Sequence, residues 1–158
     1  MKTPELFRQV LSQWATGVTV VTTAGDGAPY GLTVSSFSSV SLDPMMVLVC
    51  LDNRLSGLDH FKKSGNFGVS ILAEGQQEIS GLFARKGTER PPSLYFNGPS
   101  GIPLIREALA VIECKTAATY PGGDHTIFLG EVLSLEVLEG AKGVAPLIYF
   151  KGGYKRLT

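Results

Sequence analysis

The sequence predicts a mainly β protein, an antiparallel barrel or sandwich with a few short helices attached. Three observations lead to this fold class. Runs of β-branched and apolar residues recur along the chain and are separated by turn signals. Only short stretches carry the helical period. Helical and strand patterns do not alternate regularly, as they do in a doubly wound parallel sheet, and this favours antiparallel strands.

The first element is predicted to be a helix. Thr3 is a suitable N-cap, Pro4 suits the first helical position, and Glu5 complements the helix dipole. An apolar stripe follows at positions i, i+3, i+4 and i+7, and Gly17 stops the helix. The stripe consists of Phe7, Val10, Leu11 and Trp14.

Strands then dominate the first half of the chain. Residues 18–23 are β-branched throughout, and a turn at residues 25–27 separates them from a second strand at residues 30–36, so the pair predicts a hairpin. The continuous apolar run at residues 45–51 predicts a strand buried on both faces. A further strand is predicted at residues 67–72.

Short helices and one irregular segment interrupt these strands. Residues 56–63 predict a helix that Ser56 caps, and residues 76–83 predict a second helix. Residues 84–99 have no hydrophobic period and contain a Pro-Pro pair, so they predict a long excursion. Connections of this length are usually functional or mobile.

The last third of the chain returns to strands. Two long strands are predicted at residues 110–120 and 126–138, joined across a turn at residues 121–124. A short strand at residues 147–150 and a Gly152-Gly153 turn complete the pattern.

Length and composition limit the class of protein. The 158 residues fit a single domain over residues 1–158, and the net charge of zero argues against a nucleic-acid partner. No apolar run reaches the roughly 20 residues that cross a bilayer, and no signal peptide is predicted, so no membrane partner is expected. Cys50 and Cys114 lie in apolar, strand-like contexts, which favours free thiols and a cytoplasmic location.

Hydroxyl side chains crowd one stretch just before the apolar strand. In one interpretation they belong to a solvated strand and turn. In the other they form a binding rim, because hydroxyls and backbone N–H groups donate to phosphates and to planar heterocycles. Phe37 and Val40 would then lie beside the heterocycle. The hydroxyl residues are Thr33, Ser35, Ser36, Ser38, Ser39 and Ser41.

Other polar residues also have two interpretations. Asn53 and Ser56 are either a turn and a helix cap or contacts to the sugar chain and phosphates of a cofactor. Arg85 and Lys86 follow a predicted helix, where basic residues complement the helix C-terminus or neutralise a phosphate.

His125 follows a Gly-Gly loop and an aspartate. A lone histidine is usually structural or solvated, and His60 is not at metal-ligand spacing, so no metal site is predicted. The chain has no Gly-x-Ser-x-Gly elbow, which leaves serine-hydrolase chemistry without support. It also has no Walker motif and no Gly-x-Gly-x-x-Gly after a strand, so a Rossmann site is not predicted.

Taken together, these segments resemble the short-chain flavin reductase family, the FMN-binding split-barrel reductases of two-component flavin monooxygenases. The resemblance covers nearly the whole chain, and its strength lies in four segments that occur in the right order. They are residues 31–37, residues 39–44, the Gly123-Asp124-His125-Thr126 stretch with Leu129-Gly130-Glu131-Val132, and Pro146-Leu147-Ile148-Tyr149.

The resemblance implies a homodimeric, six-stranded, Greek-key-like split barrel with the flavin near the subunit interface. His125 would lie by the nicotinamide of NADH or NADPH, in a pocket that Gly152, Gly153 and Tyr154 also line. The segment between Arg85 and Gly98 departs from the family pattern, so FMN and FAD both stay open. The implied flavin residues are Thr33, Val34, Ser35, Ser36, Phe37, Ser39, Val40, Ser41, Asp52, Asn53, Ser56, Phe83, Ala84, Arg85 and Lys86.

The function implied is NAD(P)H-dependent reduction of FMN or FAD by hydride transfer, with the reduced flavin supplied to a partner monooxygenase. A fold does not fix a function, so three alternatives stand beside it. They are a flavin carrier or sensor without reductase activity, an oxidoreductase of the same fold that acts directly on an organic substrate, and a purely structural β-domain. The second would need more basic residues for a further phosphate than this neutral chain has.

Overall fold

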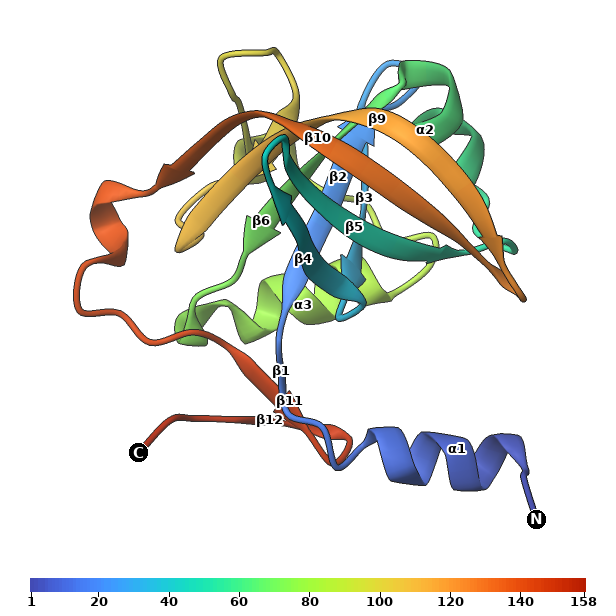
Figure 1. Cartoon of the computed structure of the whole chain (residues 1–158). Helices are drawn as coiled ribbons and strands as arrows, with labels where there is room; N and C mark the ends of the chain where they lie inside the picture. The colour runs from blue at the N-terminus through green and yellow to red at the C-terminus, as the bar shows by residue number, and fades with distance from the viewer.

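The computed structural model describes residues 1–158 and is built around one antiparallel sheet of seven strands (Figure 1). This confirms the mainly β, antiparallel prediction. The main sheet has one strand more than the six of the implied barrel. In spatial order its strands are β3 (Pro29–Val34), β2 (Thr19–Ala24), β6 (Asn66–Ile71), β9 (Ala110–Gly122), β10 (His125–Val137), β5 (Met45–Asp52) and β4 (Phe37–Leu42).

The two edges of this sheet are consecutive in the chain. Strands β3 and β4 are the outermost strands, yet only Ser35 and Ser36 separate them. The sheet therefore has to roll up until its edges meet. Ser36 lies between these two edges and is held to β5, because its carbonyl accepts from the Cys50 N–H at 3.3 Å and its hydroxyl donates to the Cys50 carbonyl at 2.8 Å. The hydroxyl-rich stretch thus lies at the seam of the barrel.

The barrel interior holds the largest core cluster, in which Phe61, Phe67 and Phe128 are almost fully buried. Strand β5 contributes only alternate residues to this core, since Val47 is buried and its neighbours along the strand are not. The prediction that this strand is buried on both faces is therefore wrong. A continuous apolar run does not by itself distinguish a strand buried on both faces from one whose outer face is apolar but open.

Helix α1 (Pro4–Leu11) begins as predicted, with the Leu6 N–H donating to the Thr3 hydroxyl at 3.1 Å. It ends at Leu11 rather than before Gly17, because the chain tightens into turns and then enters β1 (Thr16–Gly17), which pairs with β11 (Ile148–Phe150). No residue of α1 is buried, and the helix projects away from the barrel (Figure 1). Its apolar stripe has no partner within the protomer.

Helix α2 (Leu58–Ser64) has Gly57, not Ser56, at its N-cap and no side-chain cap. The predicted capping role of Ser56 is therefore wrong. The Tyr30 ring explains the glycine, since a Cβ on Gly57 would lie 2.1 Å from that ring. Helix α3 (Gln77–Ala84) follows a short 3-10 turn, η1 (Glu74–Gln76), close to its predicted position.

The predicted excursion is only partly irregular. It contains the 3-10 turn η2 (Pro92–Leu94) and β7 (Tyr95–Asn97), which pairs with β8 (Pro103–Ile105). The fully buried carboxylate of Glu113 holds the following turn, because it accepts from the N–H groups of Ser100 and Ile102 at 3.1 Å. These contacts are long-range, so no local sequence pattern announces them.

The C-terminal segment forms a second, small sheet below the barrel (Figure 1). After η3 (Glu139–Ala141), strand β11 pairs with β1 on one side and with β12 (Gly153–Lys155) on the other. The short strand and the turn were predicted, whereas β12 was not. None of the helices combines the length and the apolar character that crossing a bilayer would require.

Candidate functional site

A cavity of about 250 Å³ lies between β3, the segment before α2 and the C-terminal end of α3. We call it the cationic pocket. It brings together six of the predicted flavin residues: Thr33, Ser56, Phe83, Ala84, Arg85 and Lys86. Its remaining lining residues are Tyr30, Gly31, Leu32, Leu55, Gly87 and Arg90.

The charged residues that line the cationic pocket are all positive. Three cations, Arg85, Lys86 and Arg90, line it, and no aspartate or glutamate does. In a chain of zero net charge this is a local concentration of positive charge. Guanidinium groups and hydroxyls are the donors that proteins use for phosphate oxygens. The pocket therefore suits a phosphate-bearing ligand.

Two hydroxyls of this pocket differ in their freedom. Ser56 makes no cap bond to α2, so its hydroxyl stays available to a ligand. Thr33 donates its hydroxyl hydrogen to the Ser80 carbonyl at 2.6 Å, which leaves the Thr33 oxygen as an acceptor only. Of the two, Ser56 is therefore the hydroxyl donor for a phosphate.

A second cavity has a volume of about 370 Å³. Ser35 and Phe37 line it together with Trp14 and residues of β1 and β2. Thr33 near the end of β3 lines the cationic pocket, and Ser35, just beyond the end of that strand, lines this second cavity. Only Val34 separates these two lining residues in the chain, so the two cavities border the same short segment.

The rest of the hydroxyl stretch lines neither cavity. The side chain of Val34 is buried in the core, and the Ser36 hydroxyl is held by β5. On β4, Ser39 and Val40 are exposed and the Ser41 hydroxyl accepts from the Asp43 N–H at 3.2 Å. Their predicted flavin contacts stay predictions.

His125 lies at the start of β10, with Asp52 as its register partner on β5. Asn53 fastens the two strand ends together. Its N–H donates to the Asp124 carbonyl at 2.9 Å, and its side-chain oxygen accepts from the Thr126 hydroxyl at 2.6 Å. The predicted residues Asp52, Asn53 and His125 thus form one group, which we call the histidine cluster.

The two carboxylates in and beside the histidine cluster each have a partner. The Asp124 carboxylate lies 2.7 Å from Nδ1 of His125, an arrangement that favours the proton on Nδ1 and leaves Nε2 free. Hydrogen bonds from Arg54 hold the pKa of the Asp52 carboxyl well below its ordinary range. The cluster and the cationic pocket are linked through the chain, since Leu55 and Ser56 follow Asn53 by two and three residues.

Gly152, Gly153 and Tyr154 lie elsewhere in the protomer, at the β11–β12 turn. The Tyr154 hydroxyl is 2.7 Å from the Ser80 hydroxyl on α3. They line neither cavity, and no hydrogen bond joins them to the histidine cluster. Their predicted place beside the nicotinamide is therefore not formed within one protomer, and it stays a prediction.

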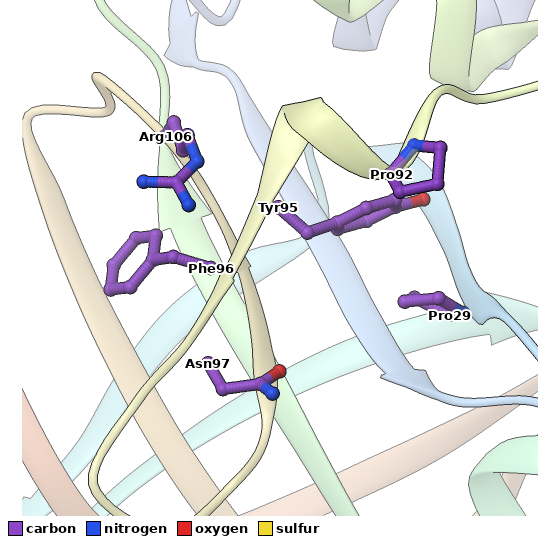
Figure 2. Close-up of a pocket in the computed structure, with 6 residues that line it drawn as sticks. All are labelled: Pro29, Pro92, Tyr95, Phe96, Asn97 and Arg106. Atoms are coloured by element: carbon purple, nitrogen blue, oxygen red, sulfur yellow. The ribbon is translucent and has the colours of Figure 1, made fainter.

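A third cavity, of about 320 Å³, contains none of the predicted residues (Figure 2). Tyr95 points toward Pro92 and Pro29 on one side of β7, whereas Phe96 and Arg106 lie on the other. The Tyr95 hydroxyl is buried without a partner, and burial raises its pKa. With one cation and no serine or threonine in its lining, this cavity lacks the chemistry of the cationic pocket.

The sequence did not predict six residues of the cationic pocket: Tyr30, Gly31, Leu32, Leu55, Gly87 and Arg90. Tyr30 is an aromatic residue inside a predicted strand, and Arg90 lies in a segment without a period. Neither has a local signal, because only the tertiary structure brings them to the pocket.

Known proteins resemble this chain over almost all of its length. A family model described as "Flavin reductase like domain" matches residues 11–158. A reductase component of 4-hydroxyphenylacetate 3-monooxygenase from Thermus thermophilus is 38% identical, over 98% of this chain and 97% of that protein. The reductase subunit HsaB of a flavin-dependent monooxygenase from Mycobacterium tuberculosis is 37% identical, over 96% and 81%.

Solved structures agree with these sequence matches. The flavin reductase PheA2 superposes with a TM-score of 0.89 at 38% identity, covering 99% of both chains. The NADH:FAD oxidoreductase SgcE6 of Streptomyces globisporus, solved in complex with NAD and FAD fragments, gives a TM-score of 0.90 at 34% identity. That match covers 100% of this chain and 96% of the other.

Proposed function

The chain belongs to the flavin reductase-like domain family, and from this premise we propose that it is an NAD(P)H:flavin oxidoreductase. It transfers a hydride from NADH or NADPH to FMN or FAD. The observation that carries the proposal is the cationic pocket, joined through residues 53–56 to the histidine cluster. A flavin nucleotide needs both a phosphate site and an approach for a nicotinamide.

The donor set of the cationic pocket fits the phosphate end of a flavin nucleotide. Ser56, Arg85 and Lys86 are the groups we assign to that phosphate. Small-molecule pockets usually measure about 300–1,000 Å³, so a cavity of about 250 Å³ is too small for a whole flavin. We assign the rest of the molecule to the neighbouring cavity at Ser35 and Phe37.

A bound flavin supplies the ring that accepts the hydride, and the protein binds and orients the two reactants. This division of work needs no dedicated acid or base. We assign His125 to positioning the nicotinamide through Nε2, with Asp124 holding the ring through Nδ1. The Asn53 bonds keep the turn that carries His125 fixed to β5.

A homodimer is part of the proposal. The apolar stripe of α1 is open to solvent, with Phe7 64% and Trp14 75% exposed. Along β10, Leu133, Leu135 and Val137 form a second exposed apolar row. Exposed apolar surface of this extent is typical of protein interfaces, and a second copy of the chain would cover it. Sedimentation would give twice the 16.8 kDa chain mass.

The reduced flavin is proposed to serve a partner monooxygenase. The relatives named above are a reductase component and a reductase subunit of monooxygenases. A cytoplasmic location is proposed on the basis of the two free cysteines.

One experiment tests the proposal directly. The purified protein is mixed with each pairing of FMN or FAD with NADH or NADPH in an anaerobic stopped-flow instrument, and the loss of oxidised-flavin absorbance is followed. We expect at least one pairing to bleach rapidly. Flavin binding without bleaching in all four pairings would contradict the reductase and favour a flavin carrier or sensor.

A further inference from the structure

Arg90 forms hydrogen bonds to the backbone at the end of α3 and in the loop that follows it. Its Nη2 donates to the carbonyls of Arg85 at 3.0 Å and Leu82 at 3.4 Å, and its Nη1 donates to the carbonyl of Thr88 at 3.1 Å. These acceptors span the segment that carries Arg85 and Lys86. One side chain therefore sets the shape of the loop that lines the cationic pocket.

The position of this loop creates an electrostatic problem for an anion. The cationic pocket lies at the C-terminal end of α3, where free carbonyls carry the negative pole of the helix dipole. The last turn of α3 has no basic residue of its own, and its C-cap is extended rather than left-handed. Two arginines donate to these carbonyls: Arg90 to that of Leu82, and Arg85 through Nε to that of Gly81 at 3.2 Å. An unfavourable helix end thereby becomes acceptable to a phosphate.

The Arg90 guanidinium is itself held in place. It stacks on the Phe83 ring, with Cζ 4.9 Å from the centroid, and Phe83 is 2% exposed and packs edge-on against Tyr95. The guanidinium has five N–H donors, and the three carbonyls take one from Nη1 and two from Nη2. None of the three carbonyls accepts from Nε. Nε is buried without a partner. A ligand cannot reach a donor without exposed surface, but the second N–H of Nη1 is engaged by none of these carbonyls, and it is the unused donor that Arg90 offers at the cationic pocket.

We propose that Arg90 is the specificity-determining residue for the flavin phosphate. It orders the 85–90 loop, covers the end of α3 and keeps an unused donor at a pocket that contains no acid. The pocket consequently selects phosphorylated flavins, FMN or FAD, over riboflavin, which has the same ring and sugar chain without the phosphate. This inference rests on the proposed function.

The test compares FMN with riboflavin in the wild type, Arg90→Gln and Arg90→Lys, with affinities measured by flavin fluorescence. We expect the wild type to prefer FMN. Arg90→Gln should weaken FMN at least tenfold, as expected for loss of a charge-assisted hydrogen bond, and change riboflavin less than about threefold. Arg90→Lys should fall between, because a point charge cannot serve several carbonyls at once.

Arg106→Gln is the matched control. Arg106 also stacks on an aromatic ring, with Cζ 6.0 Å from the Phe96 centroid, but in the third cavity (Figure 2). The control removes the same charge and should leave the ratio of the two affinities unchanged. Circular dichroism of each variant reports folding. If Arg90→Gln does not fold, the ratio of FMN affinity to riboflavin affinity in Arg90→Lys decides: a ratio below that of the wild type supports the inference, and an unchanged ratio overturns it.

The outcomes separate the inference from the proposed function. A wild type that binds riboflavin as tightly as FMN overturns the phosphate selectivity but leaves the reductase intact. A folded Arg90 variant that loses both flavins equally shows a merely structural arginine and also overturns the inference. A wild type that binds neither flavin and oxidises no NAD(P)H would instead overturn the proposed function.

Discussion

The cationic pocket and the histidine cluster are built in different ways. The pocket draws its walls from β3, the segment before α2 and the end of α3, and side-chain packing such as Tyr30 against Gly57 shapes it. The histidine cluster is an exposed strand end, held by the β5–β10 register and by Asn53. Under the proposed function, the flavin phosphate would meet a preformed cavity, whereas the nicotinamide would meet a strand end held by backbone register and by Asn53. Substitutions should therefore separate flavin binding from nicotinamide use.

The largest separation is expected from removing two pocket cations together. The double variant Arg85→Gln with Lys86→Gln should weaken FMN about 10- to 100-fold, because each charge-assisted contact contributes roughly 1 kcal/mol or more in a half-open site. The KM for NAD(P)H at saturating flavin should hardly change. Fluorescence titration and steady-state kinetics measure the two effects.

Lys62→Gln with Lys63→Gln gives the charge-matched control, since these lysines are exposed on α2 and do not line the pocket. An equal loss of FMN affinity in this control would mean that only the overall charge matters, and the pocket assignment would fail.

The next largest effect is expected in the histidine cluster. His125→Ala should raise the KM for NAD(P)H about tenfold through loss of one positioning contact, while the FMN affinity changes little. His60→Ala is the control for the KM effect, because His60 is the only other histidine and lies on α2, outside the histidine cluster. Equal losses of flavin and nicotinamide binding in His125→Ala would defeat the separation.

A smaller effect is expected when the hydrogen bond between Asn53 and Thr126 in the histidine cluster is lost. Asn53→Ala removes the acceptor for Thr126 and should raise the KM for NAD(P)H about threefold. Because Thr126→Val breaks the same hydrogen bond, the double variant should be no worse than the worse single variant. Additive losses in this double-mutant cycle would show that the bond does not position the histidine cluster.

The smallest effect concerns pH. The folded-state pKa of Asp52 is lowered by Arg54, so this pairing stabilises the fold above the ordinary carboxyl pKa of about 4 and is lost only as pH falls through the lowered value. Asp52 thus stays ionised from pH 5 to 8 and adds no pH dependence there. In Arg54→Gln, the NMR titration of the Asp52 carboxyl should return toward its ordinary midpoint; an unmoved midpoint would refute the assignment to Arg54.

The two regions also differ in how far the sequence predicts them. The turn that carries His125 and the hairpin of β2 and β3 follow from local patterns, because glycines and β-branched runs act over a few residues. Arg85 and Lys86 were found from their place after a predicted helix. Arg90 was not, since its carbonyl acceptors come from the backbone of the folded loop.

The incorrect predictions have the same origin in long-range packing. Ser56 has the residue type of a helix cap, but the Tyr30 ring requires glycine next to it and moves the cap to Gly57. The apolar stripe was predicted only as a stripe: Phe7, Val10 and Leu11 lie on α1, Trp14 lies beyond its end, and nothing in the protomer covers these residues. Periodicity predicts that a face is apolar and does not identify what it packs against.

Trp14 gives this molecule a built-in optical reporter. It is the only tryptophan in the chain, it is 75% exposed, and it lines the cavity shared with Ser35 and Phe37. Oxidised flavins absorb where indole emits, so a flavin seated beside it would quench the emission by energy transfer. Occupancy of that cavity can therefore be followed in the unlabelled wild-type protein at a single residue.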